Sequence, residues 1–255
     1  MQLGHGVRET GAPVRFEVVF LAPDGTEERL RLEQAARYPF ERVPPVRSFP
    51  SFRGQRNNTG LWWTTTTGSH VGFESWLERD LLIGFDFAPT VTGIASQPFW
   101  LHWHEDGRER RHAPDFFLRH ACGTGSVIDC RPADRIGPRD ESVFANTAAA
   151  CSRVGWRFEV LHAPNRVRTA NLRWLSGYRH HRCGRGDLAR AAVELAADPV
   201  PLWELAAALG DPIGTLPVVF HLLWYTELET NLSVPLMENS LVAARTAAAS
   251  TAHGA

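Results

Sequence analysis

The sequence predicts an α/β protein whose core is a mixed β-sheet flanked by helices. Apolar residues recur every four positions from Phe73 to Phe85, which predicts a helix with one apolar face. Short β-rich segments with Gly-containing turns follow between residues 91 and 131. A second helix over residues 140–154 and a strand over residues 156–162 complete an order that is typical of an α/β core with a mixed sheet.

An N-terminal extension is expected over residues 1–70. Residues 15–21 and 27–32 flank a Pro-Asp-Gly turn, a pattern that predicts a β-hairpin. Residues 42–60 are rich in Pro, Arg, Ser, Gly and Asn and are expected to form a long loop. Its arginines either belong to a solvated linker or contact DNA phosphates. The arginines concerned are Arg47, Arg53 and Arg56.

The character of the sequence changes near Pro164, and residues 165–255 are expected to form a separate module. Its expected elements are helices over residues 168–182, 187–197, 201–209 and 214–225 and a hairpin over residues 226–237. A helix, a turn, a second helix and a β-wing form the outline of a winged-helix module. Winged-helix modules normally read DNA with Arg or Lys on the second helix, but residues 214–225 contain neither.

Composition limits the classes of protein to which the chain can belong. With 44% hydrophobic and 22% charged residues, it matches an ordinary globular protein. No apolar run approaches the ~20 residues that span a bilayer, and residues 1–12 lack the pattern of a signal peptide. The cytoplasm is therefore the expected location. The four cysteines form no Cys-x-x-Cys pair and are expected to be isolated reduced thiols.

Charge is distributed unevenly along the chain. Residues 198–255 carry six acidic residues and one Arg, a net charge of −5, whereas residues 1–197 have a net charge of +4. All 27 basic residues are Arg, and the chain contains no Lys. The acidic C-terminal module is therefore expected to bind a partner protein rather than DNA, through exposed aromatic residues among Trp203, Phe220 and Trp224.

Three carboxylates and one cation form the constellation that best suits chemistry. Glu78 borders the apolar face of the first helix, and Asp115 begins a strand in Pro-Asp-Phe-Phe. Asp129 and Arg131 are two residues apart in one strand, so their side chains are expected on the same face. Converging carboxylates suit Mg²⁺, which can activate water beside a phosphodiester while a cation holds the phosphate. Singly, each is weak evidence: an Asp at a strand start is more often a turn or edge residue, and a Glu on a helix is usually solvated. Asp129 and Arg131 could form an ion pair on an exposed sheet face.

Two further features are weaker candidates. His102 and His104 share a strand face and could bind a metal, but no third ligand is placed beside them. The Trp62-Trp63 pair could stack on bases or simply anchor a loop.

The order Glu, Pro-Asp, acid-x-cation resembles the PD-(D/E)xK nuclease superfamily. The fuller set of motifs is similar to the TnsA-type endonuclease subunit of heteromeric, Tn7-like transposases. The motifs are F-E-S-W-L-E-R-D over residues 73–80, Q-P-F over 97–99, R-R-H-A-P-D-F-F over 110–117 and V-I-D-C-R-P over 127–132. The similarity covers residues 71–162 well and extends more loosely through the C-terminal module.

The resemblance implies a restriction-endonuclease-like core over residues 71–164 that uses Mg²⁺ or Mn²⁺. It places the catalytic site on Glu78, Asp115, Asp129 and Arg131, with the three carboxylates as metal ligands. Glu78 is preferred to Glu74 because the family pattern is Ser-x-Leu-Glu. Asp129 stands where the family has Gln, which favours metal binding. Arg131 stands where the family has Lys, and Arg is always protonated and cannot act as a base.

The resemblance also implies a function and partners. It implies an endonuclease subunit that binds double-stranded DNA at transposon ends and cuts the non-transferred strands. A DDE-type transposase would cut and join the other strands, and an AAA+ ATPase would regulate both. Two alternatives remain open at this stage: a stand-alone restriction or repair nuclease of the same fold, and a transposase assembly subunit whose catalytic site has decayed.

Overall fold

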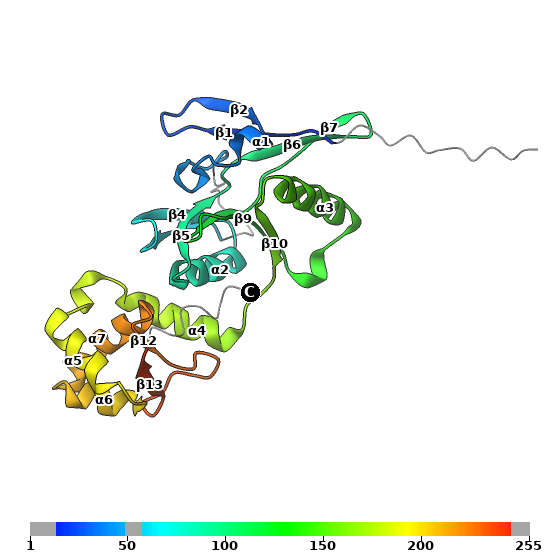
Figure 1. Cartoon of the computed structure of the whole chain (residues 1–255). Coiled ribbons are helices and arrows are strands. Elements are labelled where there is room, and N and C mark those ends of the chain that lie inside the picture. Colours follow the sequence, from blue (N-terminus) through cyan, green and yellow to red (C-terminus); the bar gives the residue numbers. More distant parts are fainter. Residues whose placement is uncertain (1–13, 49–57, 246–255) are drawn as a thin grey trace, which may run out of the picture.

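The computed structural model describes residues 14–48 and 58–245 (Figure 1). It confirms a mixed α/β protein, in which two four-stranded sheets are joined by helices and followed by a mainly helical C-terminal part. Within these residues, no single helix is long and apolar enough to cross a membrane. Two helices near the C-terminus, Leu202–Ala208 and Pro212–Trp224, reach that length and hydropathy only as a pair bent by 119°.

The first sheet is antiparallel and has the strand order β2-β1-β6-β7. Its strands are β1 (Phe16–Leu21), β2 (Glu27–Arg31), β6 (Trp100–Glu105) and β7 (Arg108–His112). The expected N-terminal hairpin is present as β1 and β2, and Gly25 adopts the positive φ of +86° that their tight turn requires. Because β1 also pairs with β6, the N-terminal extension and the β6–β7 hairpin form one sheet. The short helix α1 (Leu32–Ala35) follows β2.

The second sheet is mixed and has the strand order β10-β9-β8-β5. Its strands are β5 (Val91–Ser96), β8 (Phe116–His120), β9 (Gly125–Cys130) and β10 (Arg157–Leu161). Only β9 and β10 are parallel, because the helix α3 (Pro138–Arg153) carries the chain across between them. Successive β9 residues face opposite helices, since Val127 packs with Cys151 of α3 and Ile128 packs with the helix on the other face.

That other helix is α2 (Trp76–Phe87), which is shorter at its start than the sequence pattern suggested. Phe73 and Glu74 precede the helix: Phe73 ends β4 (Ser69–Phe73), which pairs with β3 (Gly60–Thr64). The Ser75 side chain accepts a hydrogen bond from the Glu78 N–H at 3.2 Å and so begins the helix. The expected helix start at Phe73 was therefore wrong, and Glu74 lies outside the helix that carries Glu78.

The C-terminal part consists of four helices and a small three-stranded sheet of order β11-β13-β12. Its elements are α4 (Arg166–Leu175), α5 (Gly186–Leu195), β11 (Val200–Pro201), α6 (Leu202–Ala208), α7 (Pro212–Trp224), β12 (Leu228–Glu229) and β13 (Leu241–Ala244). The helix expected over residues 168–182 ends at Leu175. The expectation that residues 226–237 alone form a hairpin was also wrong. The strand that pairs with β12 is β13, which lies beyond that range and also pairs with β11.

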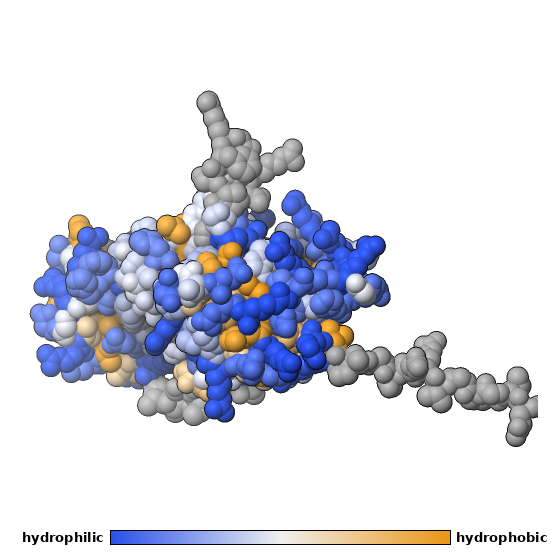
Figure 2. Space-filling model, turned by 90° about the horizontal axis from the view of Figure 1, so that it is seen from above, coloured by the Kyte–Doolittle hydropathy of each residue, from blue (hydrophilic) through white to orange (hydrophobic). Residues whose placement is uncertain are grey.

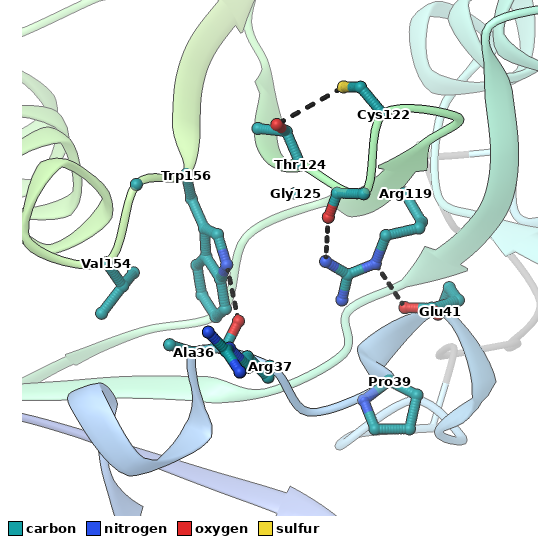
Figure 3. A pocket seen from close by; sticks show the side chains of 12 residues that line it. Ala36, Arg37, Pro39, Glu41, Arg119, Cys122, Thr124, Gly125, Val154 and Trp156 are labelled. Carbon is teal, nitrogen blue, oxygen red and sulfur yellow. Dashed lines mark hydrogen bonds and ion pairs between the residues drawn. The ribbon is translucent and has the colours of Figure 1, made fainter.

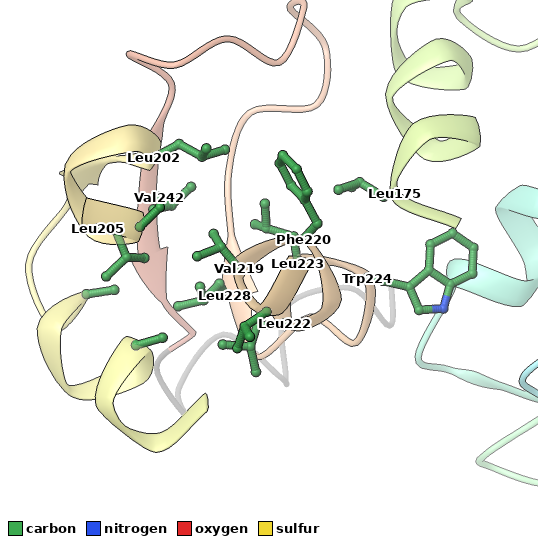
Figure 4. Packing of buried hydrophobic residues seen from close by; sticks show 14 of the residues in the cluster. Leu175, Leu202, Leu205, Val219, Phe220, Leu222, Leu223, Trp224, Leu228 and Val242 are labelled. Carbon is green, nitrogen blue, oxygen red and sulfur yellow. The ribbon is translucent and has the colours of Figure 1, made fainter. Parts of the chain in front are cut away.

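One apolar cluster holds the C-terminal part together (Figure 4). Leu175, Leu205, Val219, Leu223 and Val242 from helices and strand all contribute to it, and each is almost fully buried. Ile83 of α2 belongs to the same cluster, so the C-terminal part packs directly on the core. The Arg173 Nε also donates to Asp80 Oδ1 at 3.1 Å across this junction.

The β3–β4 hairpin fastens the same junction from the other side. The Arg179 guanidinium lies 4.6 Å from the centre of the Trp62 ring and donates to the Trp63 carbonyl oxygen at 3.1 Å. Trp62 and Trp63 therefore lie in a strand, and both contact the C-terminal part rather than anchoring a loop. On the face shown in Figure 2, hydrophobic residues form small separate groups among hydrophilic ones.

Candidate active site

The predicted site residues meet at one end of the mixed sheet, in a cavity of about 600 Å³. We call it the carboxylate cavity, because Glu74, Glu78 and Asp115 line it. Its walls come from the start of α2, the end of β7, the start of β8 and the residues after β9. Arginine side chains complete the lining: Arg47, Arg111, Arg131 and Arg135.

Asp115 lies at the floor of the cavity, immediately before β8, and is only 8% exposed. Its Oδ2 accepts a hydrogen bond from the Cys130 backbone N–H at 2.7 Å, which links the start of β8 to the end of β9. Burial raises the pKa of Asp115 to about 8, and the negative charges of Asp129 and Glu78 contribute to the rise. A carboxyl group held this way has a strong free-energy preference for either a proton or a cation.

Glu78 lies in the first turn of α2 and is equally buried. Its Oε2 accepts from the Glu74 backbone N–H at 2.6 Å, and its Oε1 accepts from the Ser75 hydroxyl at 2.8 Å. Together with the Ser75 cap, these bonds fix the carboxylate at the positive end of the helix. Burial still raises the pKa of Glu78, although both hydrogen bonds oppose the rise.

Asp129 occupies a different position from the other two predicted carboxylates. It is fully buried in β9 and does not line the cavity. The Nε2–H of His112 donates to both of its carboxylate oxygens, at 2.8 and 3.0 Å, and His112 itself lines the cavity. Asp129 therefore lies behind His112, close enough for its charge to raise the pKa of Asp115.

His112 is the site residue that sequence reasoning missed. It stands three positions before Asp115 in Arg-His-Ala-Pro-Asp, at the end of β7. Nothing in the sequence pairs it with Asp129, because the contact joins two different sheets. The only available signal was its place inside the motif that also carries Asp115.

Arg131 follows directly after β9 and lines the cavity, where it is half-buried. Its backbone N–H donates to the Leu161 carbonyl oxygen at 3.0 Å, which holds the segment against β10. Its positive charge lowers the pKa of both Asp115 and Glu78, against the larger effect of burial. The structure thus places Arg131 with these two carboxylates, while Asp129, two residues earlier, faces His112.

Glu74 and Arg47 form the outer edge of the cavity. The Arg47 guanidinium donates to Glu74 Oε2 at 2.8 Å, whereas Glu74 Oε1 is buried and has no hydrogen-bond partner. Among the three arginines predicted to contact DNA, Arg47 is thus committed to an ion pair. Arg53 and Arg56 lie outside the described residues.

The residues present fit a divalent cation held by few protein ligands. Within the described parts of the chain, no three His, Cys, Asp or Glu side chains stand close enough together to enclose a metal. Mg²⁺ needs no such cage, since it is usually bound through one or two carboxylates and keeps several waters. Asp115 and Glu78 supply two oxygen ligands that repel one another, and Glu74 Oε1 is a third oxygen without a partner. The His102 and His104 candidate is weaker, because His102 Nδ1 contacts Glu109 at 2.9 Å and His104 is exposed.

A second cavity of about 570 Å³ has a different character (Figure 3). We call it the Trp156 cavity. Two guanidinium groups line it, the exposed Arg37 and Arg119. Arg119 donates to Glu41 at 3.2 Å and to the Gly123 carbonyl oxygen at 2.9 Å, and Trp156 Nε1 donates to the Ala36 carbonyl oxygen at 3.1 Å. The Cys122 thiol also has a partner, the Thr124 hydroxyl. The buried polar groups there satisfy one another and leave little for a ligand.

Comparison with known proteins adds no relative to this picture. No protein-family model matches the chain, and no curated protein is significantly similar to it.

Proposed function

We propose that the chain is a metal-dependent DNA endonuclease whose active site is the carboxylate cavity. The observation that carries the proposal is the pair of buried carboxyl groups with raised pKa, Asp115 and Glu78, beside Arg131 in one cavity. Burying ionisable carboxyl groups costs free energy, and groups whose pKa is raised in this way are characteristic of functional sites rather than of stabilising contacts. Phosphodiester hydrolysis is the chemistry that carboxylates and a permanent cation at one point suit best.

In this site Asp115 and Glu78 hold the metal ion, Mg²⁺ or Mn²⁺. Bound there, the ion would lower the pKa of a water molecule and polarise a phosphoryl oxygen. Arg131 holds the scissile phosphate or the charge that develops on it, and does not accept the proton, because Arg stays protonated. Asp129, the third predicted ligand, acts in this arrangement through its charge and through His112, which it orients at the cavity wall.

The fold we propose is restriction-endonuclease-like over residues 71–164 with a winged-helix-like module over residues 165–255. The mixed sheet between α2 and α3, with the carboxylates at one end, supports the first assignment. The order α5, β11, α6, α7, β12, β13 and the pairing of β13 with both other strands support the second. Residues 1–70 contribute the β1–β2 hairpin at the edge of the other sheet.

We propose further that this nuclease is the TnsA-type subunit of a heteromeric transposase. The motif resemblance supports this role, in which the subunit cuts the non-transferred strands and works with a DDE-type transposase and an AAA+ ATPase. The C-terminal module is better suited to a protein partner than to DNA. The helix α7 contains no Arg or Lys, and Trp203 on α6 is 43% exposed, while Phe220 and Trp224 fill the module's own core.

The test is strand-specific cleavage of element-end DNA by the purified chain with its partner transposase. We expect Mg²⁺-dependent nicking of the non-transferred strand that chelation abolishes. Asp115→Asn should remove the activity and leave the fold intact, because it removes a ligand and a charge without changing shape. Glu41→Gln in the Trp156 cavity is the matched control and should cleave normally. Undiminished cleavage by Asp115→Asn would contradict the proposal.

A further inference from the structure

The carboxylate cavity continues into a neighbouring cavity of about 390 Å³. Arg111 of β7 lines both cavities, so the two adjoin at this residue. The second cavity lies between the β6–β7 hairpin and the start of α3, which run side by side in Figure 1. Trp103 and Glu105 form its β6 wall, and Ser142 and Val143 form its α3 wall. We call these two adjoining cavities together the groove.

Arginines dominate this groove. Six line it: Arg47, Arg110, Arg111, Arg131, Arg135 and Arg139. Arg47 is paired with Glu74, and Arg110 Nε lies 3.9 Å from Glu105 Oε2. Glu105 also accepts hydrogen bonds from Ser142 and Asn146, so its charge is largely engaged. Positive charge therefore exceeds what the groove's own carboxylates neutralise.

Three of these arginines, Arg111, Arg135 and Arg139, are exposed and uncommitted. None of them forms an ion pair with any residue in ranges 14–48 and 58–245. The Arg111 guanidinium lies 4.5 Å from the centre of the Trp100 ring, a cation–π contact at the wall of the carboxylate cavity.

Separate elements hold the three arginines on the walls of one groove. Arg111 is in β7, Arg135 ends the 3₁₀ turn Ala133–Arg135 that follows β9, and Arg139 is in the first turn of α3. Nearby acids do not neutralise them. Asp140 Oδ2 is occupied by the Gly137 N–H at 3.1 Å, and neither Asp134 nor Glu141 lines either cavity.

We propose that Arg111, Arg135 and Arg139 form an arginine track that binds the phosphate backbone of duplex DNA next to the carboxylate cavity. The inference rests on the proposed nuclease function and adds where the substrate lies. Uncommitted guanidinium groups along a groove suit a backbone that presents a regular row of phosphates, each of which Arg contacts with two N–H groups. The track differs from the loop arginines that the sequence singled out, of which only Arg47 is described and is already paired.

The test measures binding of the full chain to a fluorescein-labelled duplex by anisotropy, over a series of salt concentrations. Ca²⁺ replaces Mg²⁺ so that binding is measured without cleavage. Each phosphate contact contributes about 0.9 to the slope of log K against log salt. The triple variant with Arg111→Ala, Arg135→Ala and Arg139→Ala should therefore bind more weakly, with a slope smaller by about 2.7. Replacing the same three residues by Lys should retain most of the slope, because the charge remains.

The control is Arg190→Ala, which removes an exposed arginine of α5 far along the chain from the track. It should bind like wild type. A triple variant that is folded by circular dichroism and keeps the wild-type slope would overturn the track, as would a wild type without salt-dependent binding. If the wild-type protein neither bound metal nor cleaved DNA, but the triple variant still lost duplex binding, the track would stand and the proposed nuclease function would fail.

Discussion

The carboxylate cavity and the Trp156 cavity have similar volumes, about 600 and 570 Å³, but opposite electrostatics. In the Trp156 cavity, the carboxylate of Glu41 is paired with the Arg119 guanidinium, Trp156 Nε1 is bonded to a carbonyl oxygen, and the second guanidinium, Arg37, is exposed. In the carboxylate cavity, Asp115 and Glu78 repel one another, and Arg131 offsets only part of that repulsion. The candidate site is thus distinguished by charge that the fold leaves unneutralised, rather than by volume.

The largest expected effect is on the free energy of unfolding, which should change in opposite directions when a carboxylate is removed from each of the two cavities. In the absence of metal, the folded-state pKa of Asp115 is about 8, against 3.8 for the free side chain. The native state therefore holds one more proton than the unfolded state across this range, and stability falls as pH rises from about 4 to about 8. At pH 8 the cost is several kcal/mol, since each pKa unit corresponds to ~1.4 kcal/mol.

Asp115→Asn should remove this cost, raise the free energy of unfolding of the metal-free protein at pH 8 and flatten its pH dependence. Glu41→Gln should instead lower stability by about 1 kcal/mol, because it breaks a partly buried ion pair. Urea denaturation of both variants at pH 5 and pH 8 measures these changes. If Asp115→Asn destabilised the protein as much at pH 8 as at pH 5, ionisation of Asp115 would not lower the stability of the folded protein.

A smaller effect is expected at Arg131, which distinguishes a phosphate-binding cation from a surface ion-pair residue. Arg131→Ala should reduce the rate of DNA cleavage about a hundredfold, the usual effect of removing one group that stabilises transition-state charge. Arg131→Lys should retain most of the rate, because the position keeps its positive charge. Arg119→Lys in the Trp156 cavity is the control and should leave the cleavage rate unchanged. Wild-type cleavage by Arg131→Ala would remove Arg131 from the site.

The smallest of these effects is expected at His112. Removing an outer residue that orients a metal-site group typically costs 10- to 100-fold in affinity or activity. His112→Ala should therefore weaken metal binding and cleavage about tenfold. His102→Ala is the matched control. Like His112, His102 lies in the β6–β7 hairpin and contacts a carboxylate, here Glu109, but it lies outside the cavity. Equal losses in the two variants would assign His112 a structural role alone.

The parts of the site that the sequence predicted are those that depend on local pattern. Asp115 was predicted at the start of a strand and Glu78 on a helix, and the motif resemblance assigned both to one site. Two placements failed because the helix starts later, and the strand ends earlier, than the sequence pattern predicted. Ser75 caps α2 and leaves Glu74 outside the helix, and β9 ends at Cys130, so the rule that alternate residues share a face did not extend to Arg131.

The features that the sequence did not reveal depend on contacts between distant segments. His112 and Asp129 lie in different sheets and meet only after both have formed. The pairing of β12 with β13 joins strands of two and four residues, too short for a hydrophobic pattern to identify. The proposed arginine track likewise depends on folding, because Arg111 is distant in sequence from Arg135 and Arg139.

Metal binding measured by calorimetry tests the central claim most directly, because it requires no DNA and no partner. At pH 7 we expect wild type to bind Mn²⁺ and to release close to one proton, since Asp115 is mostly protonated before the metal arrives. Asp115→Asn should bind at least tenfold more weakly and release no proton, while Asp198→Asn, which changes an exposed residue, should match wild type. Wild-type affinity and proton release in Asp115→Asn would contradict the account.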